Sequence, residues 1–186
     1  GFSVLRFNFR GVGRSQGYFD NGPGELADAA SALDWLQLQN PDSRFCWIAG
    51  VSFGTYVAMQ LLMRRPEIDG FICAVGTGGT LVGTSQYLRE KKKDIVIGCA
   101  DPRGAAMYSL FSTGQAKASE GGSITEGIGL GRVTPIIDGL KIEKPYLVPD
   151  EEAVPVIFDL LEHEGLCLGG SSGINVAGAI RLAKEL

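Results

Sequence analysis

Residues 70–80 have the sequence GFICAVGTGGT, in which a short apolar run leads directly into a glycine-rich turn. The apolar run predicts a buried strand over 70–75, and apolar residues at helical spacing predict a helix over 81–92. A second apolar run at 95–100 predicts the next strand. A strand, a helix and a strand of these lengths are typical of a βαβ crossover in a parallel sheet.

The same alternation continues on both sides of this unit. Upstream, the pattern predicts strands over 3–9 and 45–51 and helices over 25–38 and 54–64. Downstream, a glycine-rich loop region after residue 102 is followed by a helix over 149–164, a brief strand over 166–168 and a last helix to 186. The predicted fold class is α/β, a mostly parallel sheet of βαβ units covered by helices on both faces.

The composition of the chain disfavours several classes of function. The chain has 186 residues, 45% of them hydrophobic and 20% charged, with a formal net charge of −4. These values indicate a packed globular protein without the basic field that nucleic acids or anionic membranes attract, so we expect a small-molecule ligand. No apolar run approaches a membrane span and no signal-peptide pattern is present, so a cytoplasmic location is expected. The four cysteines lack CxxC spacing and there is one histidine, which disfavours a metal site.

A G-x-S-x-G pattern occupies residues 50–54, GVSFG, between a predicted strand and a predicted helix. In that setting Ser52 would stand clear of the sheet as a nucleophile, and the backbone N–H of Phe53 would point at an oxyanion. The alternative is an ordinary glycine turn. With the preceding FNFRGVGRS at 7–15, residues 1–71 resemble the middle of an α/β-hydrolase, which implies the triad order serine, acid, histidine.

Asp101 and His163 follow Ser52 in that order. His163, however, lies within DLLEHE at 159–164, which is helical in pattern and has a glutamate on each side of the histidine. A surface histidine is therefore the favoured interpretation.

Two further glycine-rich turns each precede a predicted helix. In Gly76-Thr77-Gly78-Gly79-Thr80, backbone N–H groups and hydroxyls converge where the helix dipole favours a phosphate dianion. This turn is neither a P-loop nor a G-x-G-x-x-G fingerprint, and a plain tight turn is the alternative. In the second, GGSSG at 169–173, Ser171 places a hydroxyl able to face a ring nitrogen.

These two turns, with ITEGIG at 124–129 between them, resemble the C-terminal half of the cysteine synthase family over residues 69–186. The resemblance implies a fold type II enzyme that depends on pyridoxal phosphate. It implies that Gly76, Thr77, Gly78, Gly79 and Thr80 hold the cofactor phosphate, that Ser171 meets the pyridine nitrogen, and that 127–129 lies near the substrate. The implied reaction is β-replacement on an O-acylated serine with sulfide, a transferase or lyase chemistry that gives cysteine.

The Schiff-base lysine and the loop that grips the substrate carboxylate belong to the N-terminal half of that family. None of the seven lysines of this chain lies in the expected motif, so we expect weak or lost cofactor binding and an incomplete enzyme. The chain thus resembles a chimera of a hydrolase-like segment, 1–71, and a synthase-like segment, 72–186. Three functions stay open: a cysteine synthase-like enzyme, a serine hydrolase using Ser52, and a non-catalytic chimera. The oligomeric state is left undetermined.

Overall fold

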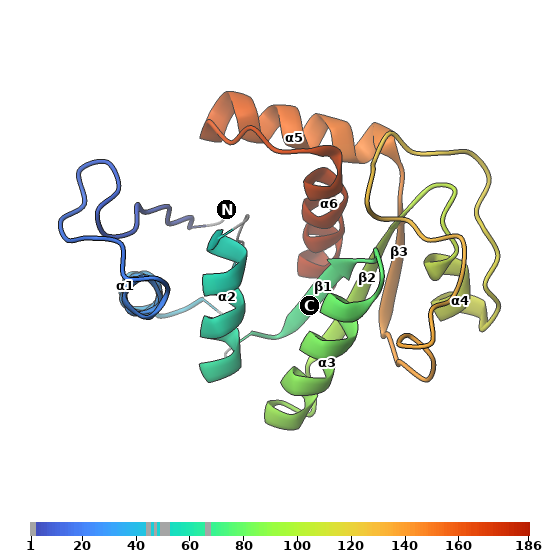
Figure 1. Ribbon diagram of the computed structural model, residues 1–186, viewed down its shortest axis with the longest axis horizontal. Helices are drawn as coiled ribbons and strands as arrows, with labels where there is room; N and C mark the ends of the chain where they lie inside the picture. Colours follow the sequence, from blue (N-terminus) through green and yellow to red (C-terminus); the bar gives the residue numbers. More distant parts are fainter. Residues whose placement is uncertain (1–2, 44–45, 47, 49–52, 66–67) are drawn as a thin grey trace. The chain divides into compact units, whose positions relative to one another are not determined.

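The computed structural model describes residues 3–43, 46, 48, 53–65 and 68–186 (Figure 1). The chain divides into two compact units, unit 1 (Gly1–Ile68) and unit 2 (Asp69–Leu186). The two segments inferred from the motifs, 1–71 and 72–186, remain a prediction about the origin of the chain.

Unit 1 is built from two helices, α1 (Pro23–Gln39) and α2 (Phe53–Arg64), which confirm the two helices expected there. They pack through a small apolar core of Ala29, Leu33, Val57 and Leu61.

The prediction of a strand over 3–9 is wrong, because this segment has no regular structure. A strand is stable only when a neighbour satisfies its backbone hydrogen bonds, and no strand is present among the described residues of unit 1. The strand expected over 45–51 falls largely outside the described residues.

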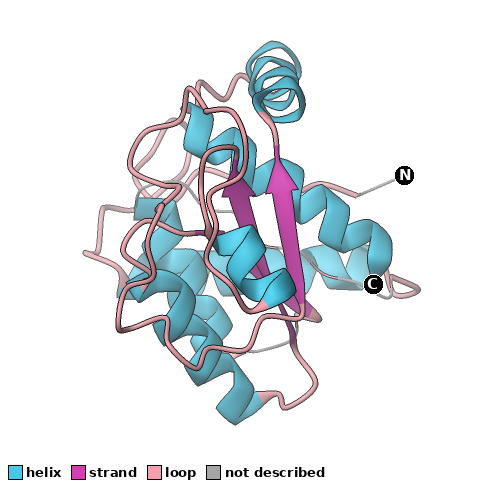
Figure 2. Cartoon of the chain, turned by 90° about the vertical axis from the view of Figure 1, so that its right-hand side faces the viewer, coloured by secondary structure: helices cyan, strands magenta, loops and turns pink. Residues whose placement is uncertain are grey.

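Unit 2 contains a three-stranded parallel sheet in the order β1-β2-β3, which confirms the expected fold class. Its strands are β1 (Gly70–Ala74), β2 (Val96–Pro102) and β3 (Lys144–Val148). Cys73 pairs in register with Cys99, and Asp101 with Leu147. The strand arrows point the same way, so their carboxyl ends share one edge of the sheet (Figure 2).

Helices cover both faces of this sheet. They are α3 (Gly79–Lys91), α4 (Met107–Thr113) and α6 (Gly170–Glu185), and α5 (Asp150–Glu164) packs against α6. Successive residues of a strand point to opposite faces. Ala100 lies against α6, where a Cβ on Gly178 would come within 2.8 Å of it, whereas the Asp101 carboxylate accepts a hydrogen bond from the first turn of α4. Figure 1 accordingly shows α6 and α4 on opposite sides of the strands.

Two elements of unit 2 were missed by the sequence pattern, and one was wrongly expected. β3 begins with Lys144 and Pro145, and a proline within a run argues against a strand unless the strand lies at the edge of its sheet, as β3 does in the order β1-β2-β3. α4 has only seven residues, too few for a helical period to show. The prediction of a brief strand over 166–168 is wrong, because that segment connects α5 to α6 without pairing with another strand.

None of the helices in the described part of the chain is long and apolar enough to cross a membrane.

Candidate functional site

The glycine-rich turn at 76–80 joins the carboxyl end of β1 to the start of α3. Gly78 is the residue before the helix and takes a left-handed conformation, with φ of 97°, which a residue with a Cβ rarely adopts. No described side chain caps α3, a helix of 13 residues. Thr77, Gly79 and Thr80 are exposed. Uncapped N–H groups at the positive end of a helix dipole form a site suited to an anion.

A neighbouring loop fixes the turn from the side. The N–H of Gly129 donates to the Val75 carbonyl at 2.9 Å. A Cβ on Gly76 would lie 2.7 Å from the Gly127 carbonyl oxygen, so only glycine allows this approach. The Thr134 hydroxyl donates to the Thr77 carbonyl at 3.0 Å. The loop at 127–129, expected from the resemblance to lie near the substrate, therefore contacts the turn.

Ser171 lies in the first turn of α6, at the same edge of the sheet. It is joined to the end of β1 through Asn175. The Oδ1 atom of Asn175 accepts a hydrogen bond from the Ala74 N–H at 2.8 Å, and its Nδ2 atom donates to the Ser171 carbonyl at 2.8 Å. The structure thus brings the predicted turn and Ser171 together. Sequence reasoning missed Asn175, because no motif marks it.

These residues offer the donor groups that pyridoxal phosphate needs. The phosphate would meet the free N–H groups and hydroxyls of 76–80, and no described atom lies within 4 Å of a Cβ built on Gly79, which leaves space there. Ser171 offers a neutral hydroxyl, which can bond a ring nitrogen without protonating it.

A polar hollow of about 340 Å³ adjoins this region. Its lining includes Arg103, Ser123, Thr125, Ile128 and Gly129, so it shares the loop that contacts the turn. Asp150, the first residue of α5, holds the segment at 123–124 in place beside the hollow. Its carboxylate accepts hydrogen bonds from the Ser123 hydroxyl at 2.6 Å and from the Ile124 N–H at 2.8 Å. The hollow is large enough for the side chain of an amino-acid substrate.

The lysines with partners in unit 2 lie away from this edge. Lys91 is at the far end of α3, about 18 Å from the turn. Lys144 is the first residue of β3, at the opposite edge of the sheet, and pairs with Glu185 at 2.7 Å. Lys117, by contrast, is close in sequence to a residue held near the carboxyl edge of the sheet. It lies two residues before Ser119, whose hydroxyl accepts a hydrogen bond from the N–H of Gly104, just beyond the end of β2.

The triad that could be written for a hydrolase is not assembled by the structure. Ser52 lies outside the described residues. The Asp101 carboxylate is fully buried and accepts the Tyr108 N–H at 2.8 Å, whereas the His163 ring is exposed and contacts the Asp159 carbonyl of its own helix. His163 also lies about 20 Å along α5 from the end that meets the hollow. The surface interpretation of His163 is therefore supported.

The buried Asp101 predicts a distinctive dependence of stability on pH. Burial raises its pKa from 3.8 to about 6, against the opposing effect of the backbone N–H groups of Tyr108 and Met107. A raised pKa in the folded state gives stability that is complete below pH 4 and lost as pH rises through 6. We expect the free energy of unfolding to fall by about 3 kcal/mol over this range relative to Asp101→Asn.

Urea unfolding of both proteins at pH 4, 5, 6 and 7 measures this difference. The amide introduced by Asp101→Asn would keep an oxygen that accepts the Tyr108 N–H but would not titrate, so this variant is a matched control. Parallel pH profiles for the two proteins would contradict the prediction.

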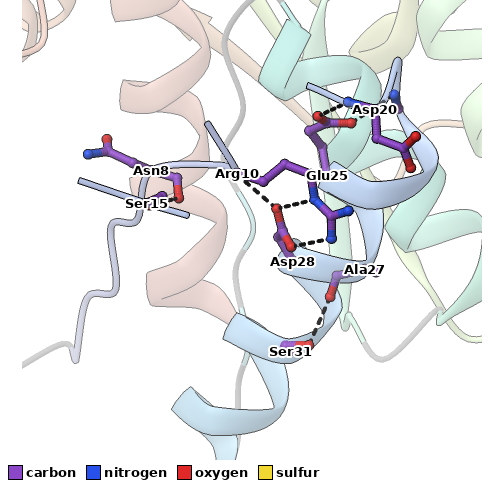
Figure 3. A network of polar contacts seen from close by, with 9 residues as sticks. Asn8, Arg10, Ser15, Asp20, Glu25, Ala27, Asp28 and Ser31 are labelled. Carbon is purple, nitrogen blue, oxygen red and sulfur yellow. Dashed lines mark hydrogen bonds and ion pairs between the residues drawn. The ribbon is translucent and has the colours of Figure 1, made fainter. Parts of the chain in front are cut away.

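In unit 1, an ionic network organises the glycine-rich segment that follows residue 9 (Figure 3). Arg10 forms a two-point contact with Asp28 of α1, with nitrogen–oxygen distances of 2.8 and 3.1 Å. The hydrogen bond from Arg10 lowers the pKa of Asp28 although partial burial opposes this. Buried Glu25 accepts the N–H groups of Asp20 and Gly22, both at 2.8 Å. The loop is thereby tied to the start of α1.

Phe53, expected to supply an oxyanion N–H, is the first residue of α2. Its ring packs against Phe9, Phe19 and Tyr56, with centroids 5.4 to 6.0 Å apart. The helix expected after the G-x-S-x-G pattern is therefore present, whereas the strand and turn of the elbow fall largely outside the described residues. The oxyanion role of Phe53 stays a prediction.

The fold and site of unit 2 define an α/β protein with a phosphate-suited turn at the carboxyl edge of a parallel sheet. The family model described as "Pyridoxal-phosphate dependent enzyme" matches residues 28–186. The chain therefore belongs to the family of pyridoxal-phosphate-dependent enzymes. The match begins within α1 and so includes residues on both sides of the boundary between the units.

Similar proteins include cysteine synthase 1 of Neurospora crassa, 41% identical over 127 residues, which are 64% of this chain and 33% of that protein. A solved structure of an O-acetylserine-dependent cystathionine β-synthase from Helicobacter pylori is 27% identical, with a TM-score of 0.58, over 69% of this chain and 40% of that one. The chain spans about a third of the length of the curated relatives it matches.

A third similarity concerns a smaller part of the chain. A protein of unknown function from Agrobacterium tumefaciens, provisionally assigned as an α/β-hydrolase, is 69% identical over 39% of this chain and 33% of that one. The TM-score of 0.37 is too low to assign a fold.

Proposed function

We propose that unit 2 binds pyridoxal phosphate and serves the β-replacement chemistry of cysteine synthases, in which sulfide replaces the acyloxy group of an O-acylated serine. The observation that carries this proposal is the uncapped glycine-rich turn at 76–80, tied to Ser171 through Asn175. The cysteine synthases among the relatives support the same reaction, a transferase or lyase chemistry.

Different residues of this chain would have different roles in the proposed reaction. When bound, pyridoxal phosphate supplies an electron sink for bond changes at the α- and β-carbons of an amino acid. The turn at 76–80 would hold the phosphate through its N–H groups and the hydroxyls of Thr77 and Thr80. Ser171 would orient the ring from the opposite end without adding a proton to it. The loop at 127–129 and the adjoining hollow would receive the substrate beside the turn.

Titration of the protein with pyridoxal phosphate tests the proposal. We expect saturable binding, and Thr77→Ala is expected to weaken it about tenfold, because a hydrogen bond to a charged group contributes about 1.5–3 kcal/mol. Fluorescence and absorbance of the cofactor measure the affinity. Thr113→Ala, an exposed threonine at the end of α4, is the matched control and should leave binding unchanged. A folded protein that does not bind the cofactor would disprove the proposal.

Binding is expected to be weak, because the positions of the lysines in α3 and β3 leave them out of reach of the turn. Borohydride reduction followed by peptide mapping tests for a covalent lysine adduct. Lys117 is the residue to examine first, since its loop contacts the segment after β2.

A second candidate function is that of a serine hydrolase acting through Ser52. The observation that favours it is that residues 53–64 form α2, the helix expected after the G-x-S-x-G pattern. A fluorophosphonate should then label the protein, and Ser52→Ala should abolish the labelling. A folded protein that neither binds the cofactor nor reacts with the fluorophosphonate would be a non-catalytic chimera, whose segments 1–71 and 72–186 come from two families.

A further inference from the structure

Asn175 joins two parts of unit 2 that are far apart in the sequence. It lies one helical turn after Ser171 on α6, and its side chain is half-buried. Its amide oxygen accepts the N–H of Ala74, the last residue of β1, and its amide nitrogen donates to the carbonyl of Ser171. Both distances are 2.8 Å. The partners are a backbone donor and a backbone acceptor, so only one orientation of the amide satisfies both.

The Asn175 amide links the end of β1, which leads into the phosphate turn, to Ser171 at the start of α6. Ala74 is two residues before Gly76, where the phosphate turn begins, and Ser171 would meet the opposite end of the cofactor. The turn itself is held independently, because Gly129 donates to Val75 and the Gly127 carbonyl abuts Gly76. Loss of the amide would therefore leave the turn in place but remove the hydrogen bond that ties α6, next to Ser171, to the end of β1.

We infer that Asn175 is a positioning residue for pyridoxal phosphate: it holds Ser171 at the separation from the phosphate turn that the length of the cofactor demands. This inference rests on the proposed function. It predicts that Asn175 contributes to the affinity for a ligand that reaches both ends of the site. It also predicts that Asn175 does not affect the affinity for a ligand that occupies the turn alone.

Two probes of different length separate these cases. Asn175→Ala in the full chain is expected to weaken pyridoxal phosphate binding about tenfold, which corresponds to one lost bond to a well-placed group, and to alter the fluorescence of the bound ring. Binding of inorganic phosphate, followed by broadening of its phosphorus NMR line, should change less than about twofold. Ile180→Ala, an exposed position on the same helix, is the matched control.

The decisive measurement is the coupling with Ser171. If Asn175 acts by placing Ser171, then in a Ser171→Ala background the loss of Asn175 should weaken cofactor binding less than about twofold. Equal weakening in both backgrounds, or equal weakening of cofactor and inorganic phosphate, would show a general structural role and overturn the inference.

The remaining outcomes are also distinct. Unchanged cofactor binding by Asn175→Ala, in a protein that binds the cofactor, overturns the inference and leaves the proposed function standing. Absence of cofactor binding by the folded unsubstituted protein overturns both.

Discussion

Gly76→Ala is expected to weaken pyridoxal phosphate binding by a factor of about 100 or more. The added Cβ would lie 2.7 Å from the Gly127 carbonyl oxygen, which is a backbone atom and cannot rotate away. Either the turn or the loop at 127–129 must then shift, and the bond between Gly129 and Val75 would be strained with it. Several N–H donors would leave the phosphate position together, each worth about 1.5–3 kcal/mol toward a charged acceptor.

Equilibrium titration with the cofactor measures this effect. Gly131→Ala is the matched control: it lies in the same loop region, and no described atom lies within 4 Å of its added Cβ. Comparable affinities for the two variants would show that the close approach at Gly76 plays no part in binding. Retention of the native thermal transition by Gly76→Ala would separate a local effect on the turn from unfolding.

Gly173→Ala is expected to lower the free energy of unfolding of unit 2 by about 2–3 kcal/mol. An added Cβ would lie 2.5 Å from the Ala153 carbonyl oxygen and 3.0 Å from a methyl group of Ile157, so α5 and α6 would be forced apart. Alanine favours a helix over glycine by about 1 kcal/mol, and the overlap must outweigh that gain. The close packing of these two helices therefore depends on the missing side chain.

Gly83→Ala provides the matched comparison within the same unit. Gly83 lies in α3, is exposed, and has no described atom within 4 Å of an added Cβ. Its substitution should raise the free energy of unfolding by about 0.5–1 kcal/mol through helix propensity alone. Denaturant unfolding of both variants measures the contrast. A stabilised Gly173→Ala protein would refute the packing argument.

The local patterns in the sequence predicted part of this architecture well. The helices α1, α2, α3, α5 and α6 and the strands β1 and β2 were predicted within a few residues, because apolar spacing acts over short distances. The strand expected over 3–9 failed for the opposite reason. Its composition favours a strand, but a strand also needs a partner, and composition does not supply one.

What the sequence by itself determined is the α/β class and the place of the glycine-rich turn between β1 and α3, because both depend on residues that are neighbours in the chain. Only the tertiary structure decided that Asn175 bonds Ala74 across 101 positions, that Gly127 abuts Gly76, and that the Asp101 carboxylate is buried beneath α4. Such contacts depend on how whole helices pack against a sheet, and that packing is the sum of many weak interactions that no short motif encodes.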